Sequence, residues 1–559
     1  MTEPLPPSSD VMAGRRAQMF PVLSAAQLGR ITRYGELRDV AAGELLFDQG
    51  QADLPMLVVL EGEIEVVHPS LEGERLITVL GPGEFTGEIQ MIAGRRSLVR
   101  GRARTAARVV QIARARLRTL VQTDAELGEL LLRAFILRRM GLIAQGEGDA
   151  VLIGSKHSAG TLRVQEFLTR NGHPYSYVDA DTDPKIQELL DGLHVGCGDI
   201  PVLLCRGTKT LKNPSNAEVA ECLGFNAVLD EHAIRQVVVV GAGPAGLAAA
   251  VYAASEGLDV LVLEANVPGG QAGSSSKIEN YLGFPTGISG GALAARALTQ
   301  AEKFGAELAV ATSVSELGCQ RRPYELAVAD GRRVRARTVV IATGAEYRRP
   351  ALADLARFEG LGVYYGATSI EARMCGSEEV VVVGGGNSAG QAAVFLAQTA
   401  AHVYMLVRGK GLAETMSRYL IRRIEDTPNL TLHPHSEIVA VAGETRLEHV
   451  TWQDTVTGER TSRPLRHVFL MIGAMPNTGW LAGCLALDAK GFIQTGGDLT
   501  PETLAAFAWP LARSPMPLET SLPGVFAVGD VRAASVKRVA AAVGEGSAAI
   551  QLVYRVLGE

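Results

Sequence analysis

One stretch organises this sequence: Val237-Val-Val-Val-Gly241-Ala-Gly243-Pro244-Ala245-Gly246-Leu-Ala-Ala-Ala. A run of valines precedes a G-x-G-x-x-G pattern, and an alanine-rich segment of helical character follows it. This order is typical of a strand, a tight turn and a helix N-terminus that together hold a dinucleotide pyrophosphate. We expect Gly241 to form the turn, Gly243 to let the backbone approach the phosphates and Gly246 to let the helix pack against its strand. The next strand ends at Glu264, an acid placed to hold the hydroxyls of an adenosine ribose.

Length and composition indicate a globular chain of several domains. The 559 residues suffice for about three or four domains, and 47% of them are hydrophobic. A net charge of −6 gives no basic surplus for phosphates, which argues against a nucleic-acid-binding protein. The N-terminus has no charged region followed by an apolar core, and no apolar run reaches the roughly 18 residues of a membrane span. We therefore expect a soluble cytoplasmic protein.

The cysteines and histidines predict neither a disulfide framework nor a metal site. The six cysteines are scattered, and no two of them form C-x-x-C, which is the pattern of a cytosolic protein. His433 and His435 lie close together, but no third ligand stands at a useful spacing. We therefore expect no metal.

The N-terminal part consists of short predicted strands with glycine turns between them, which favours an antiparallel barrel or jelly roll. The order of these turns over residues 17–145 resembles the cyclic-nucleotide-binding domain of the catabolite-activator family. The resemblance implies that Gly87 and Glu88 lie at the ribose of a cyclic nucleotide. The family's phosphate-binding arginine is replaced by Ser97, with Arg95 and Arg96 two and one residues early, and a shifted turn could still point Arg96 at a phosphate. We favour a degenerate or repurposed sensor over a cyclic-nucleotide receptor, and no DNA-binding helix-turn-helix follows.

Residues 149–228 alternate strand, helix and strand, with a further helix expected from Asp183 and an Ile-Pro pair before the next strand. This order resembles the thioredoxin/glutaredoxin fold, in which Pro201 would be the cis-proline. The family's two cysteines are replaced by Ser158 and Thr161. Hydroxyl groups cannot exchange disulfides, so we expect a docking or spacer module.

From about residue 235 to the end, the sequence resembles the NADPH-dependent thioredoxin reductase family. The shared motifs are Pro268-Gly-Gly270-Gln271, Ile278-Glu-Asn280, Thr338-Val-Val-Ile-Ala-Thr343-Gly344 and Gly524-Val-Phe-Ala-Val-Gly529-Asp530. The resemblance implies that FAD is bound by Gly241, Gly243, Pro244, Ala245, Gly246, Glu264, Gly270, Gln271, Asn280, Ala342, Thr343, Gly344, Gly529, Asp530, Arg538, Val539 and Ala540. A helix that begins at the last three of these residues would stabilise an anionic reduced flavin through its dipole.

A second dinucleotide pattern, G-x-G-x-x-A, follows the valine run that starts at Val380. Its second strand ends in Arg408 rather than in an acid, and an arginine can pair with the 2′-phosphate of NADPH. The expected NADPH-binding residues are Gly384, Gly386, Asn387, Ser388, Ala389, Arg408 and Lys410.

The main departure from the resembled family lies at Gly362-Val-Tyr-Tyr-Gly366-Ala-Thr-Ser369-Ile370. In thioredoxin reductases two cysteines flank Ala-Thr here, and a proton-donating aspartate follows them. Gly366 and Ser369 hold the cysteine positions, so no catalytic residue is assigned. We expect Cys375 to be a structural thiol.

These observations predict a multidomain α/β protein: an N-terminal β-jelly roll, a thioredoxin-like α/β domain and two Rossmann-like dinucleotide-binding domains. The expected limits are 17–145 for the cyclic-nucleotide-binding-like domain, 149–228 for the thioredoxin-like domain, 235–350 and 467–559 for the FAD-binding domain, and 351–466 for the NADPH-binding domain.

The predicted activity is hydride transfer from NADPH to FAD and then to oxygen, a quinone, a ferredoxin or flavodoxin, or a small molecule. The N-terminal domains would bias the motion of the nucleotide domains, and the resemblance implies a homodimer. Two alternatives stay open. One is a thioredoxin-disulfide reductase that uses Cys197 or Cys375. The other is a non-catalytic scaffold whose flavin senses the redox state.

Overall fold

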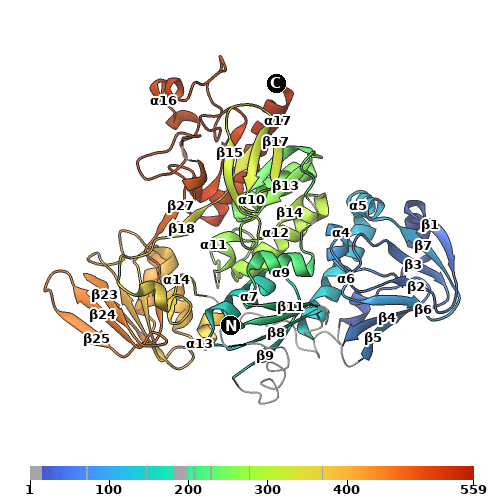
Figure 1. The fold of residues 1–559 in the computed structure, drawn as a ribbon, viewed down its shortest axis with the longest axis horizontal. Coiled ribbons are helices and arrows are strands. Elements are labelled where there is room, and N and C mark those ends of the chain that lie inside the picture. The colour runs from blue at the N-terminus through green and yellow to red at the C-terminus, as the bar shows by residue number, and fades with distance from the viewer. Residues whose placement is uncertain are drawn as a thin grey trace.

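Figure 1 shows the computed structural model of the chain. The N-terminal domain (blue) lies at one end, a small α/β domain (teal) follows, and two larger lobes (green to red) complete the chain. The structure describes residues 15–70, 73–145, 148–181, 196, 199–205, 209–226, 229–275, 277–367, 369–481 and 483–559. Within these ranges, no helix combines the length and the apolar character needed to cross a membrane.

The first lobe is built on the predicted parallel strands. Its sheet has the order β14-β13-β12-β17-β16-β15, and β28 pairs with β17. The strands are β12 (Ile234–Val240), β13 (Val260–Leu263), β14 (Glu307–Ala309), β15 (Val314–Gly318), β16 (Tyr324–Val328), β17 (Arg333–Ile341) and β28 (Val525–Ala527). The helices are α10 (Pro244–Ser255), α11 (Gly270–Gly273), α12 (Gly290–Phe304), α16 (Pro501–Ala506) and α17 (Val539–Gly558).

Alternate valines of β12 divide the core of this lobe in two. Val237 and Val239 pack with α10 and α17, and Val238 and Val240 pack on the other face against β15 and β16. Successive side chains of a strand point to opposite faces of the sheet. Because both faces are buried here, every position of the strand is apolar, which explains its continuous run of valines.

The second lobe repeats the plan with the parallel order β19-β26-β20-β21-β22. Its strands are β19 (Val363–Tyr364), β20 (Glu379–Val383), β21 (His402–Leu406), β22 (Leu430–His433) and β26 (Val468–Leu470), with a second sheet of β23 (Ser436–Ala442), β24 (His449–Asp454) and β25 (Arg460–Arg463). The helices are α13 (Ser369–Met374), α14 (Asn387–Leu396) and α15 (Arg418–Glu425).

The expected limit between residues 466 and 467 is displaced. Because β26 pairs with β20, residues 468–470 belong to the second lobe. The chain crosses between the lobes at β18 (Ala345–Tyr347) and β27 (Ala474–Pro476), which pair antiparallel. The valine pattern does not predict that one more strand of the second lobe, β26, comes before the chain crosses back to the first lobe.

The N-terminal domain is the predicted jelly roll of two antiparallel sheets, β1-β7-β3 and β2-β6-β4-β5. The strands are β1 (Glu36–Val40), β2 (Leu45–Phe47), β3 (Met56–Glu61), β4 (Ile64–Ser70), β5 (Gly73–Leu80), β6 (Arg100–Ala103) and β7 (Ala107–Ile112). The helices are α2 (Arg16–Met19), α3 (Ala25–Ile31), α4 (Gln90–Ala93), α5 (Arg114–Thr123) and α6 (Ala125–Ala144).

The small α/β domain has the sheet order β11-β10-β8-β9. It contains β8 (Ala150–Gly154), α7 (Ala159–Arg170), β9 (Ser176–Asp179), β10 (Val202–Cys205), β11 (Lys209–Lys212) and α9 (Asn216–Leu223). The Ile200–Pro201 bond is cis, as the thioredoxin-like reading predicted. Ser158 caps α7 by accepting a hydrogen bond from the Thr161 N–H at 3.4 Å. The helix expected from Asp183 lies outside the described residues, and so does Cys197.

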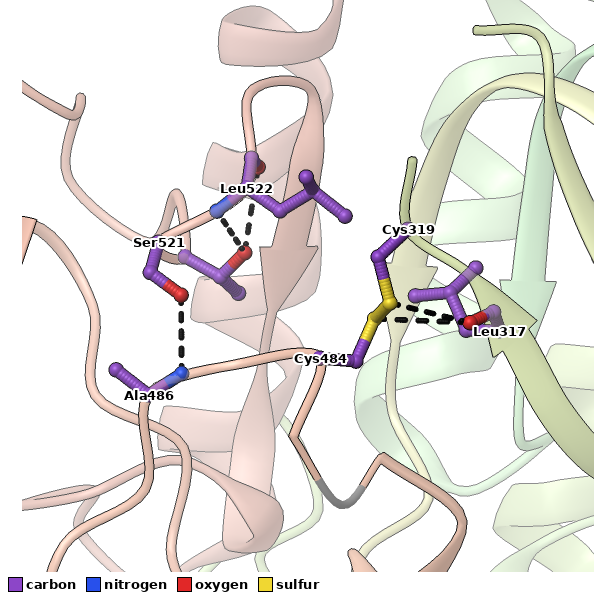
Figure 2. Close-up of a disulfide and its surroundings, with 7 residues drawn as sticks. Leu317, Cys319, Cys484, Ala486, Ser521 and Leu522 are labelled. Carbon is purple, nitrogen blue, oxygen red and sulfur yellow. Dashed lines mark hydrogen bonds between the residues drawn. A yellow bond between two sulfur atoms is a disulfide. The ribbon is translucent and has the colours of Figure 1, made fainter. Parts of the chain in front are cut away.

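The prediction that the cysteines stay unpaired is wrong for four of them. Cys205 and Cys222 form a disulfide inside the small α/β domain. Cys319, just after β15, and Cys484 form a second disulfide across 165 residues (Figure 2). This pairing could not be predicted from the sequence, because the fold and not a local motif brings the two distant segments together. Among the described residues Cys375 is the free cysteine.

Candidate functional site

The first glycine turn lies between β12 and α10, at the carboxyl end of the sheet. Gly241 has a φ of +105°, and a Cβ on Gly246 would collide with the Gly241 carbonyl oxygen. Gly243 is the N-cap of α10, and no side chain caps this helix. The first N–H groups of a 12-residue helix therefore point out of the turn without a side-chain acceptor, which is the arrangement that binds an anion.

Glu264 lies at the end of the neighbouring strand and is 9% exposed. Its carboxylate accepts hydrogen bonds from the backbone N–H of Ala242 at 2.7 Å and of Asn266 at 2.8 Å. Burial raises the pKa of this carboxyl, and the Ala242 N–H opposes the rise. Because a carboxylate accepts about four hydrogen bonds, the two oxygens keep capacity for ribose hydroxyls.

The remaining motifs of this lobe gather around the same turn. A Cβ on Gly270 would lie 3.1 Å from the Gly243 Cα, so the two backbones nearly touch. The Gln271 side chain donates to the carbonyl of Ala345. Nearby, Ala342 follows β17 and donates its N–H to Val240 O at 2.8 Å.

The linker towards the second lobe leaves space beside this turn. The Thr343 hydroxyl donates to Asn477 O at 3.0 Å. Gly344 has a φ of +63°, and a Cβ there would meet nothing within 4 Å. Asn280 lies exposed on a loop, away from the packed core of the lobe.

The C-terminal motif also reaches the first turn. Gly529 has a φ of +73°, and a Cβ on it would lie 2.9 Å from the Ala245 Cβ in the first turn of α10. Burial raises the pKa of the Asp530 carboxyl, and nearby Lys537 partly offsets this rise. Arg538 is the N-cap of α17, which continues through Val539 and Ala540 and has no side-chain cap.

The second glycine turn lies between β20 and α14. Gly384 has a φ of +138°, and Gly386 is the N-cap of α14, which likewise has no side-chain cap. Asn387 accepts a hydrogen bond from the Ser417 N–H at 2.9 Å. Ser388 is exposed at the helix start and Ala389 is buried in the lobe's core.

The cations expected at this second turn differ in their availability. Arg408 follows β21 and is exposed, with no ion pair to any residue that the structure describes. Lys410 pairs with Glu414 at 3.0 Å. Arg408 is therefore the better placed of the two to meet a phosphate.

The segment in which the resembled family carries its dithiol lies beside the first lobe. A Cβ on Gly366 would be 3.7 Å from the Ser274 hydroxyl oxygen, which is ordinary contact distance. Ser369 begins α13. Cys375 is fully buried among the apolar side chains of the second lobe, and burial raises the pKa of its thiol. A buried, protonated thiol is a poor nucleophile, so the structural role predicted for Cys375 is supported.

A cavity of about 380 Å³ lies inside the jelly roll, and its lining includes Gly87, Glu88, Arg95 and Ser97. Ser97 donates to Val99 O at 2.8 Å. The suggestion that Arg96 turns into this cavity is wrong. Its guanidinium packs on Gly224 of the small α/β domain, because that domain covers the turn from outside.

Sequence reasoning missed Arg138, which lines the same cavity from α6. Its guanidinium lies over the rings of Phe20 and Phe85, at 4.8 and 4.7 Å, and donates to Met19 O and Gly87 O. Its Nη2 is buried without a hydrogen-bond partner among the described residues. Burial lowers the pKa of Arg138 to about 9. A buried cation at a cavity wall that keeps one nitrogen without an acceptor favours an anionic ligand.

The cavity is connected to both neighbouring domains. Arg95 forms a 2.9 Å ion pair with Glu302 on α12, and the two side chains are 7% and 10% exposed. Arg139 donates two hydrogen bonds to Gly172 O and lies 3.9 Å from Glu88. No local pattern marks these contacts, since Arg95 and Glu302 are 207 residues apart.

A metal site is not found among the residues that the structure describes. His433 packs against the rings of Tyr404 and Trp452, at 5.9 and 5.8 Å. Its role is therefore accounted for by packing.

Comparisons with known proteins match two parts of the chain. The family model described as pyridine nucleotide-disulphide oxidoreductase matches residues 235–546, and the cyclic nucleotide-binding domain model matches residues 37–124. The thioredoxin reductase of Bacillus subtilis is 32% identical over 332 residues, which are 59% of this chain and 97% of that protein. That of Treponema pallidum is 33% identical over 313 residues, or 56% of this chain and 94% of that protein. The crystal structure of Lactococcus lactis thioredoxin reductase in the FR conformation is 27% identical, covers 58% of this chain and 98% of its own, and has a TM-score of 0.51.

Proposed function

Because the chain belongs to the pyridine nucleotide-disulphide oxidoreductase family, we propose that it oxidises NADPH through FAD and passes the electrons to an acceptor other than thioredoxin. FAD and NADPH are the cofactors of the thioredoxin reductases to which it is similar. Bound FAD would accept a hydride from NADPH and release two electrons to the acceptor, which requires orientation of the rings more than a protein acid or base.

The first lobe offers a fitting cradle for FAD. The uncapped N-terminus of α10 would hold the pyrophosphate, and Glu264 would hold the adenosine ribose through its remaining acceptor capacity. Gly344, beside which a Cβ would meet nothing within 4 Å, leaves room on the flavin side. Asp530 would hold the ribityl or phosphate part, and α17 would direct its N-terminus at the ring.

The second lobe offers a fitting cradle for NADPH. The uncapped N-terminus of α14 would receive the pyrophosphate. The exposed Arg408 would pair with the 2′-phosphate, since no acid stands at the end of β21 to repel it. NADPH is therefore the expected donor in preference to NADH.

One observation carries the proposal about the acceptor. Gly366 faces Ser274 of the first lobe with no side chain of its own, where the family places a thiol. Cys375, the free cysteine of the described residues, is fully buried. Within the part of the chain that the structure describes, a dithiol route to thioredoxin has no thiolate to begin it, so we infer that the electrons leave for oxygen, a quinone, a ferredoxin or flavodoxin, or a small oxidant.

The proposal includes regulation by the N-terminal domain. The Arg95–Glu302 pair connects the jelly-roll cavity with α12 of the FAD lobe, so a ligand in this cavity would act on the flavin domain through one buried contact. We also place the enzyme in the cytoplasm, and the family resemblance favours a homodimer.

Anaerobic stopped-flow mixing tests the reductive step. The purified protein should carry FAD, and NADPH should bleach the flavin absorbance at least ten times faster than NADH does. If neither nucleotide bleaches the flavin, the second glycine turn does not deliver hydride, and the proposal gives way to a non-catalytic scaffold.

A further inference from the structure

A second cavity, of about 670 Å³, lies where the thioredoxin-like domain meets both lobes. One wall comes from α7 and Tyr175, a second from Gly273–Ser275 at the end of α11, and a third from Gly360–Tyr364 of the second lobe. Ligand sites of drug-sized molecules occupy about 300–1,000 Å³ and often lie between domains. The size and position are therefore those of a binding site.

This cavity is distinct from the NADPH turn. Glu378, which lines it, stands just before β20, whereas Gly384 follows the same strand. A strand of this length spans about 16 Å. The cavity and the NADPH turn therefore lie at opposite ends of the strands of the second lobe's sheet. On its other side the cavity borders α11, which carries Gln271. It also borders Ser274, the neighbour of Gly366.

The charged groups around the cavity favour an anion. The basic residues that line it are Lys156, Arg170, Arg373, Arg446 and Arg466. The two lining carboxylates are already paired, Glu166 with Arg170 at 3.0 Å and Glu378 with Arg466 at 3.5 Å.

Arg373 and Arg446 remain available. Both are exposed, and neither forms an ion pair with a residue in the described ranges. They can therefore receive an acidic group of a ligand without first breaking a contact within the protein.

Aromatic side chains supply the remaining recognition. Tyr175 and Tyr177 of the thioredoxin-like domain and Tyr364 of the second lobe line the space. Tyrosine side chains are neutral at physiological pH, and these rings offer faces and edges to a flat ring.

The small domain holds this wall in place. Arg170 donates to Gly270 O at 2.8 Å and to Pro268 O at 3.2 Å, which fastens α7 to the loop before Gln271. The domain that has Ser158 and Thr161 in place of the resembled family's two cysteines thus forms one side of a pocket.

We propose that this cavity is the acceptor site and that it takes an anionic quinone. This inference rests on the proposed function. FAD, when bound, would relay a hydride taken from NADPH. A quinone held in this cavity would receive that hydride together with one proton from solvent, so that two electrons and two protons would convert it into the hydroquinone, with NADP⁺ as the other product.

Binding of a redox-inert probe tests the pocket without any turnover. Calorimetry of the FAD-loaded full-length chain would compare 2-naphthalenesulfonate with neutral 2-naphthol. The double variant Arg373→Gln/Arg446→Gln should bind the sulfonate about tenfold more weakly, because two charge-assisted contacts are lost. Arg460→Gln removes the same charge from exposed strand β25, outside the cavity, and should bind it as the wild type does.

Turnover gives the second readout. The ratio of kcat/KM for 1,2-naphthoquinone-4-sulfonate to that for 1,2-naphthoquinone should fall about tenfold in the double variant. Equal sulfonate binding in wild type and double variant, or an unchanged ratio, would overturn the inference. If NADPH reduces no flavin at all, the proposed function fails, and the binding measurement still decides the nature of the pocket.

Discussion

Among single residues, we propose that the charge at Arg408 selects the nucleotide. Arg408 is exposed at the end of β21 and has no competing partner among the described residues, whereas nearby Lys410 is paired with Glu414 at 3.0 Å. A guanidinium binds phosphate with two parallel hydrogen bonds. Discrimination between NADPH and NADH should therefore depend mainly on Arg408.

The variant Arg408→Gln should raise KM for NADPH about tenfold and leave the kinetics with NADH unchanged, because only NADPH carries the 2′-phosphate. Steady-state kinetics with both nucleotides would check this. Lys410→Gln is the matched control and should have the smaller effect. A loss shared equally by both nucleotides would contradict the assignment.

The cysteines allow a direct count. If Cys205 pairs with Cys222 and Cys319 with Cys484, the unreduced, denatured chain should titrate about two thiols with a disulfide reagent, out of six cysteines in the sequence. In the folded chain Cys375 should react slowly, because it is fully buried. A count near six would show that the pairs are reduced.

Residue-level prediction succeeded where chemistry and spacing are local. Strand, glycine turn and terminal acid predicted the positions of Gly243 and Glu264. It failed at Arg96, because two adjacent arginines look alike in the sequence, and only the neighbouring domain decides which one enters the cavity. Arg138 was missed for a related reason: its role depends on the tertiary position of α6.

At the scale of elements, α7 links the small domain to the flavin lobe. Its last residue, Arg170, reaches the carbonyl groups of Pro268 and Gly270, and Gly270 in turn lies against Gly243. The loop that we propose to wrap FAD is therefore held from outside its own lobe.

The variant Arg170→Ala should speed FAD dissociation about tenfold, because two charge-assisted hydrogen bonds that order the loop are lost. Release of FAD fluorescence from the diluted protein would measure this rate. Arg163→Ala removes an arginine of the same helix whose bonds to Pro214 and Asn216 stay within the small domain. Equal dissociation from both variants would assign Arg170 to domain folding alone.

The hydrophobic pattern of the sequence predicted most of the helices and strands, but it did not predict which strands pair with each other. The valine runs of β12 and β20 identify buried parallel strands because both faces are covered. Residues 468–472 also form an apolar run, Val-Phe-Leu-Met-Ile, but the run does not show which lobe's sheet the strand joins, and the expected domain limit fell before it. The pairing of β18 with β27 could not be predicted either, because it forms only where the two connections between the lobes meet.

At the scale of the whole molecule, one buried ion pair joins the jelly roll to the FAD lobe. Arg95 and Glu302 are together almost fully enclosed. Burial raises the pKa of Glu302, and Arg95 opposes that rise. Removing one partner of such a pair leaves an uncompensated charge, which costs about 3–5 kcal/mol.

Glu302→Gln should therefore destabilise the chain by about 3 kcal/mol, and Arg95→Gln/Glu302→Gln should recover part of that loss. The midpoint of the first denaturation transition in urea would measure the stability of Glu302→Gln, of Arg95→Gln and of the double variant. If the effects of the two single changes add up in the double variant, the pair does not couple the domains.

We propose that electrons enter from NADPH and leave without a dithiol. Double-mixing stopped-flow can follow both steps: the flavin is first reduced with one equivalent of NADPH under anaerobic conditions and is then mixed with an oxidant. We predict rapid return of the flavin absorbance with 1,2-naphthoquinone-4-sulfonate and none with oxidised thioredoxin. Rapid reoxidation by thioredoxin would show instead that a dithiol route operates.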